Sequence, residues 1–229
     1  HNINEGHNLD LPEPGRRELS DFYMLPCNEP DDALARLLDL VTKRIPQRFQ
    51  LNPLTDIQVL SPMRRGTLGT DNLNAILQET LNPQGEEIER FGRKYRLRDR
   101  VMQIRNNYDK EVFNGDIGSI IAVDPEERTV VVDMDGRRVG YDLTDLDELV
   151  HAYAGTIHKS QGSEYPAVVI LMTTQHFKML QRNLLYTAVT RGKQLVCIVG
   201  SHKAIGMAIA NTDMRQRRTS LKDRLRQKS

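Results

Sequence analysis

Three short, predominantly apolar runs in the second half of the chain constrain its fold more than any other feature. They are Tyr153–Ile157, Ala167–Met172 and Leu195–Gly200. Runs of this kind are typical of parallel strands that are buried on both faces, and a helix is predicted around Lys178–Arg191, between the last two. These runs predict an α/β fold with a parallel sheet flanked by helices.

The first 85 residues show the same rhythm, a strand followed by a helix, twice. The predicted elements are a strand at Ser20–Pro26, a helix at Asp31–Ile45 ended by Pro46, a strand at Asp56–Leu60, and a helix from about Thr70 ended by Asn82–Pro83. This alternation is typical of a parallel sheet.

Between these two parts the pattern changes to short β-like runs separated by turn signals. The runs are Arg100–Ile104, Ile117–Val123, Thr129–Met134 and Arg138–Leu143. They predict a small all-β barrel over residues 86–148, inserted into one α/β domain made of residues 1–85 and 149–229.

Bulk composition excludes some classes of function. The formal net charge is only +1, so nucleic-acid binding requires a local basic patch. No apolar run approaches the ~20 residues of a membrane-spanning helix, and we expect a cytoplasmic protein. Cys27 and Cys197 lack metal-ligand spacing and are expected to be buried, with no metal site. The basic tail Arg215–Lys228 is interpreted as a solvated helix face.

Two motifs narrow the interpretation: Ala154–Val168 (AGTIHKSQGSEYPAV) and Leu184–Lys193 (LLYTAVTRGK), the second ending a predicted helix on Arg191. Together they resemble the last two motifs of superfamily-one helicases. The segments Asp56–Asn74 and Asp99–Gly118 extend the likeness to RecD-like DNA helicases. The resemblance implies a second RecA-like motor domain with an SH3-like insert, as in the alpha subunit of exodeoxyribonuclease V.

The resemblance also implies a role for each polar residue of the first motif. Thr156, His158 and Lys159 would contact the DNA backbone, whereas Gly162 and Glu164 would lie near the nucleotide. Their chemistry agrees, because hydroxyl, imidazole and ammonium groups donate to phosphate oxygens, and a carboxylate accepts from a ribose hydroxyl. The alternative is a strand-ending turn that satisfies only its own backbone.

Arg191 is the predicted catalytic residue. As an arginine finger it would contact the γ-phosphate and stabilise charge during transfer, with a contribution of roughly 10³–10⁵ in rate. The alternative is an arginine that only complements the dipole of its helix, worth about 0.3–1 kcal/mol.

The loop and helix start Pro62–Asn74 (PMRRGTLGTDNLN) form the other predicted contact with DNA. Arg64, Thr70 and Asn74 are the candidate residues, since helix N-termini offer free N–H groups to anions and arginine adds charge. Whether Arg65 contacts DNA remains open. The alternative for the whole segment is a solvated loop in which Thr70 is the N-cap of the helix. In the barrel, Tyr108 and Phe113 are interpreted as core packing rather than base-stacking residues.

The chain contains no GxxxxGKS or GxxxxGKT phosphate-binding loop. ATP with Mg²⁺ would therefore be bound mainly by an N-terminal RecA-like domain of the same protein, and the isolated chain would be inactive. The expected function is the motor part of an ATP-dependent 5′→3′ DNA helicase, with single-stranded DNA and other DNA-repair proteins as partners. The alternatives are a non-catalytic interaction module with vestigial motifs, and a conjugative or RNA-directed helicase.

Overall fold

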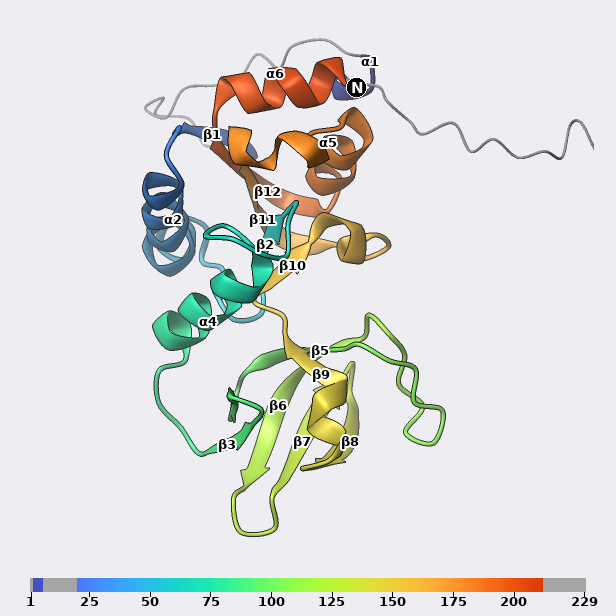
Figure 1. The fold of residues 1–229 in the computed structure, drawn as a ribbon. Coiled ribbons are helices and arrows are strands. Elements are labelled where there is room, and N and C mark those ends of the chain that lie inside the picture. The colour runs from blue at the N-terminus through green and yellow to red at the C-terminus, as the bar shows by residue number, and fades with distance from the viewer. Residues whose placement is uncertain (1, 6–19, 212–229) are drawn as a thin grey trace, which may run out of the picture.

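A computed structural model describes residues 2–5 and 20–211, and its largest element is a five-stranded parallel sheet (Figure 1). The strands lie in the order β1 (Phe22–Pro26), β12 (Gly192–Gly200), β11 (Tyr165–Met172), β2 (Ile57–Ser61) and β10 (Ala154–Thr156). All four pairings are parallel, which confirms the predicted fold class. The basic tail Arg215–Lys228 lies outside the described residues.

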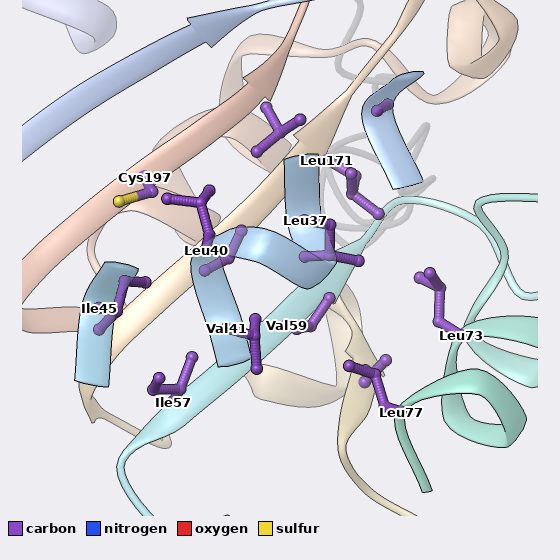
Figure 2. Packing of buried hydrophobic residues seen from close by; sticks show 14 of the residues in the cluster. Leu37, Leu40, Val41, Ile45, Ile57, Val59, Leu73, Leu77, Leu171 and Cys197 are labelled. Carbon is purple, nitrogen blue, oxygen red and sulfur yellow. The ribbon is translucent and has the colours of Figure 1, made fainter. Parts of the chain in front are cut away.

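Helices cover both faces of this sheet, and two apolar cores result. One face carries α2 (Pro30–Asp39), a π-helical turn (Leu40–Arg44), α3 (Ile45–Phe49) and α4 (Thr70–Leu81). The other carries α1 (Asn2–Glu5), α5 (Arg182–Val189) and α6 (His202–Ala210). Figure 2 shows the first core, where Leu37 and Val41 approach Val59 of β2. Cys197 of β12 is buried there and Cys27 is also buried, as predicted.

Pro46 does not end the first helix, contrary to the sequence prediction. The helical path continues through the π-helical turn into α3 and ends at Gln50, which has a left-handed φ of 57°. The N–H of Ile45 donates to the carbonyl of Leu40, five residues earlier. A wider turn changes the hydrogen-bonding register just where Pro46 has no N–H to give, so the proline starts a new segment.

The predicted helix around Lys178–Arg191 is also interrupted. A 3₁₀ helix at Thr174–Met179 precedes α5, and Thr173 and His176 cap the first turn of that 3₁₀ helix. Helix α5 ends at Val189, so Arg191 lies just beyond it, immediately before β12.

The rest of the described chain forms a smaller antiparallel β-structure below the parallel sheet in Figure 1. Its sheet has the order β8 (Arg137–Asp142), β7 (Thr129–Met134), β6 (Ile117–Asp124), β5 (Arg100–Gln103) and β9 (Leu149–His151). A separate hairpin, β3 (Glu87–Arg90) and β4 (Arg93–Arg96), precedes it. We call this region the insert. Its exact boundaries at 85/86 and 148/149 stay a prediction, and β9 pairs with β5 beyond the second of them.

A buried polar network joins the insert to α4. Asp99 is fully buried, and its carboxylate accepts hydrogen bonds from Gln78 of α4 and from Asn82, the C-cap of this helix. It also accepts from His151, from Tyr153 and from the backbone N–H of Arg96, and all five distances lie at 2.6–3.2 Å. Burial raises the pKa of Asp99, but these donors outweigh it, so the pKa lies below the usual value of an aspartate. A second contact comes from Arg100, which donates to the carbonyl of Thr55 at 3.3 Å.

No helix among residues 2–5 and 20–211 has the length and apolar character needed to cross a membrane.

Candidate nucleic-acid interface

A cavity of about 550 Å³ lies where the insert, α4 and the carboxyl ends of β2 and β10 meet. Parallel pairing of Thr156 with Ser61 places the segments that follow these two strands at the same edge of the sheet. Five of the six predicted DNA-binding residues line this cavity: Arg64, Thr70, Asn74, Thr156 and Lys159. The sixth, His158, is exposed beside Lys159 but is not part of the lining.

The loop Pro62–Gly69 folds back over the start of α4, which alters one expectation. The N–H groups of Thr70 and Asp71 donate to the carbonyls of Met63 and Arg64 at 3.1 and 3.0 Å. These two N–H groups are therefore not free for a phosphate, contrary to the reasoning that placed an anion at this helix start. Thr70 is the first residue of α4 rather than its N-cap, which is Gly69.

Gly69 makes this loop path possible. A Cβ atom at this position would lie 2.4 Å from the carbonyl carbon of Arg65, far inside van der Waals contact. The loop can therefore pack against itself only where a side chain is lacking, and Arg64 then reaches the cavity wall.

Arg64 is held only loosely. Its guanidinium lies 3.1 Å from the carboxylate of Asp71, and both side chains are largely exposed, at 67% and 53%. Exposed pairs of this kind contribute about 0–1 kcal/mol, so a phosphate can replace Asp71 at little cost. Arg65 is exposed but does not line the cavity.

Asn74 contributes mainly to positioning. Its amide donates to the carbonyl of Ala154 at 2.9 Å and accepts from the N–H of the same residue at 2.8 Å. This two-way bond fastens α4 to the outer edge of β10 and fixes the wall of the cavity. The half-buried Thr156, two residues later, also lines the cavity.

The first motif crosses the sheet from its carboxyl edge to its amino edge. A 3₁₀ turn at Ile157–Ser160 follows β10, and the buried Ile157 anchors this turn in the second core. His158 and Lys159 point outward from the turn and are exposed. Gly162 then has a φ of 87°, which favours glycine, and the chain reaches the start of β11.

Arg191 meets the far end of this motif. Its guanidinium donates to the carbonyls of Ser163 at 2.9 Å and Thr187 at 3.1 Å, and to the hydroxyl of Thr190 at 3.1 Å. The side chain is half-buried, so it is neither sealed in the interior nor free in solvent. Ser163 stands between Gly162 and Glu164, so the three predicted nucleotide-binding residues gather in one place, which we call the Arg191 corner.

Glu164 of this corner has two further neighbours. It lies 3.4 Å from the ammonium of Lys193, and it lines a second cavity of about 650 Å³ between the sheet and the insert. Among the described residues, no group of three His, Cys, Asp or Glu side chains has an arrangement that would hold a metal ion.

Sequence reasoning missed the part of the first cavity that the insert supplies. Arg93 and Lys94 of β4, together with His151 of β9, line it opposite α4. Strands β3 and β4 carry mainly charged residues, and only Ile88 and Tyr95 are buried hydrophobics, so hydropathy alternation was too weak to reveal them.

The interpretation of Tyr108 and Phe113 as barrel core is wrong. They are 74% and 47% exposed and contact each other edge to face, with ring centroids 6.1 Å apart. Both lie on the β5–β6 loop, which extends away from the small sheet (Figure 1). The bridge between Asn107 and Val112 turns this loop outward as a hairpin, so its aromatic residues cannot reach the core.

Comparisons with known proteins agree with both parts of the fold. The SH3 domain of ATP-dependent RecD-like DNA helicases matches residues 73–134, and the UvrD-like helicase C-terminal domain matches residues 151–199. The ATP-dependent RecD2 DNA helicase of Deinococcus radiodurans is 38% identical over 74% of this chain and 23% of its own length. The RecBCD enzyme subunit RecD of Mycolicibacterium smegmatis is 35% identical over 79% of this chain and 31% of its own length.

A crystal structure of Pif1 helicase from Bacteroides with ADP-AlF3 and single-stranded DNA aligns over 78% of this chain and 47% of that one, with a TM-score of 0.47 and 20% identity.

The two matched regions identify this chain as part of a superfamily-one helicase. Within that superfamily the chain belongs to the RecD-like helicases. It spans about a quarter to a third of the length of the two curated relatives.

Proposed function

We propose that this chain is the second motor domain of an ATP-dependent DNA helicase that moves 5′→3′ along single-stranded DNA. Its direct partners would be that strand and an N-terminal RecA-like domain of the same protein, with other DNA-repair proteins as further partners. The likeness to the ATP-dependent RecD2 DNA helicase of Deinococcus radiodurans supports this activity, and the direction of movement rests on family resemblance.

One observation carries this proposal: residues from four segments far apart in the sequence line a single cavity that is rich in cations. Arg64, Arg93, Lys94 and Lys159 supply positive charge, whereas Asp71 and Glu79 supply negative charge. Lysine and arginine neutralise backbone phosphates without reading sequence, so this excess suits a strand of any sequence.

The Arg191 corner would supply the chain's share of the ATPase site. Three neutral acceptors fix the direction of the guanidinium without cancelling its charge, so the group keeps its electrostatic effect on a phosphate. Glu164 would accept a hydrogen bond from the ribose, and the backbone at Gly162 would approach the nucleotide. Mg²⁺ and the β- and γ-phosphates would be bound mainly by the N-terminal domain.

In this proposal, ATP closes the cleft between the two motor domains. The turn Ile157–Ser160 would transmit closure, because the same short motif runs from the cavity at Lys159 to the Arg191 corner at Ser163. Grip on the strand in the cavity would therefore change with the state of the nucleotide, and alternation of grip produces net movement.

The test is ATPase activity with and without single-stranded DNA, measured on the full-length protein and on this chain. We expect DNA-stimulated hydrolysis by the full-length protein only. The chain should bind DNA weakly, with an affinity that falls steeply as salt rises, because a few exposed cations make the contacts. Full-length ATPase that ignores DNA would favour an interaction module, and stronger competition by RNA would favour an RNA-directed motor.

A further inference from the structure

The tip of the β3–β4 hairpin carries the most exposed large hydrophobic residue of the described chain, Phe91, at 77% exposure. Phe91 and Gly92 form the turn with φ values of 51° and 73°. Both φ values are positive, as in a type I′ turn, where Asn-Gly is the favoured pair. An aromatic residue at this position is destabilising in two ways, because its ring is exposed to water and its φ is positive. A hairpin can close with Asn-Gly and avoid both effects.

The ring of Phe91 is held on one side. The guanidinium carbon of Arg90 lies 4.0 Å from the ring centroid, and the Nε of Arg90 is buried without a hydrogen-bond partner among the described residues. Stacking on the ring is therefore the contact that orients this guanidinium. With one face covered and 77% of the residue exposed, the other face is open to a planar ligand.

The open ring stands at the rim of the cavity. Gly92, Arg93 and Lys94, the three residues that follow Phe91, all belong to the cavity lining. Lys94 is paired with Glu87 at 2.7 Å, whereas Arg93 is exposed. The hairpin therefore presents cations toward the cavity and an aromatic face beside it.

Cations next to an open aromatic ring suit one ligand class in particular, a single nucleic-acid strand with phosphates on the cations and a base on the ring. Other exposed aromatics differ in this respect. Tyr108 and Phe113 pack against each other, and neither lines this cavity.

We propose that Phe91 is a base-stacking residue: one nucleobase of the bound strand stacks on the open face of its ring, and Arg90 covers the opposite face. The proposal rests on the proposed function, since it places the strand's phosphates in the cavity. It adds a contact to the base in a site where the other named side chains would contact the backbone. Stacking of this kind tolerates any base, because every base has a π-face.

The chain contains no tryptophan, which permits a direct test. In F91W the new indole is the only tryptophan, and its fluorescence should be quenched when a short oligo-dT is added at low salt. Y108W is the matched control, because it places the same fluorophore on another exposed site away from the cavity. We expect no quenching in Y108W at the DNA concentration that saturates F91W.

A second measurement separates stacking from a structural role. F91A should lose about 5- to 150-fold in affinity for oligo-dT, the fold-change for one stacked base. It should bind an abasic strand of equal length as tightly as the unmodified chain does, because the phosphate contacts remain. An equal loss for both strands would show that the hairpin has only lost its shape, and would overturn the proposal.

The two proposals can fail separately. If fluorescence anisotropy reports binding of labelled oligo-dT while F91W shows no quenching, base stacking by Phe91 is wrong and the helicase assignment stands. If the unmodified chain binds neither oligo-dT nor the abasic strand at low salt, the cavity is not a nucleic-acid site and both proposals fail.

Discussion

The cavity and the Arg191 corner hold their cations in opposite ways. In the cavity, Arg64 is 67% exposed and paired with an exposed carboxylate, and Lys159 is exposed on its turn. In the corner, Arg191 is half-buried and donates three hydrogen bonds to neutral oxygen atoms. Exposed, solvated cations suit a partner that slides, whereas a fixed guanidinium suits a reaction that needs one geometry.

This difference has a consequence for measurement. A loosely held surface cation is screened by salt and contributes to affinity. A guanidinium fixed in advance needs no reorganisation during the reaction, so it contributes to rate. Substitutions in the two regions should therefore change different observables.

The largest expected effect is that of R191A in the full-length protein. We expect DNA-stimulated ATPase to fall by about 10³–10⁵, the range for arginine fingers, while affinity of this chain for single-stranded DNA stays unchanged. R191K is the matched control: it keeps the charge but loses the fork that reaches Ser163 and Thr190, so it should restore little activity. If R191A lost as much DNA affinity as a cavity variant, the conclusion that the cavity sets affinity and the Arg191 corner sets rate would be wrong.

A smaller effect is expected at Asp99, whose network holds the insert's wall of the cavity against α4. D99N removes the charge from a buried acceptor of five hydrogen bonds, so the free energy of unfolding should fall by about 3–5 kcal/mol. Urea denaturation measures this free energy of unfolding. The control is D109N, at an exposed aspartate, which should change it by no more than about 0.5 kcal/mol. Stability of D99N equal to that of D109N would show that the network is not a structural anchor.

Acid should reveal the same network. Because the pKa of Asp99 in the folded protein lies below its usual value, its contribution is present above the unfolded-state pKa of about 3.9 and is lost as pH falls through the folded-state pKa. The difference in stability between the unmodified chain and D99N should therefore shrink as pH falls below about 4. A difference that stays constant down to pH 2 would contradict the low pKa.

The sequence predicted the parallel sheet because its strands are buried on both faces and therefore read as unbroken apolar runs. Ala167–Met172 and Leu195–Gly200 are completely contained in β11 and β12. The same logic failed for the β3–β4 hairpin, where charged residues on both strands hide the alternation around Ile88 and Tyr95. The hairpin supplies three of the 18 residues that line the cavity, Gly92, Arg93 and Lys94, and these three were missed with it.

The candidate site shows a similar limit. Residues within one motif could be grouped from their spacing, and Thr156 and Lys159 indeed line one cavity. The sequence did not show which N–H groups are free at the start of α4. The answer depends on the loop around Gly69, which folds back on itself. Partners 80 residues apart, such as Asn74 and Ala154, also leave no mark in a single sequence.

The smallest expected effect concerns Arg64 against its neighbour Arg65, a pair that differ in whether they line the cavity. R64A should weaken binding of single-stranded DNA uniformly across sequences and reduce the slope of log affinity against log salt by about one, as the loss of one phosphate contact does. R65A removes the same charge from the same loop, so it corrects for the general electrostatic field and should leave the slope nearly unchanged. Equal slopes in R64A and R65A would mean that the loop acts only through its total charge. Arg64 would then make no individual phosphate contact in the cavity, and lining the cavity would not distinguish it from Arg65.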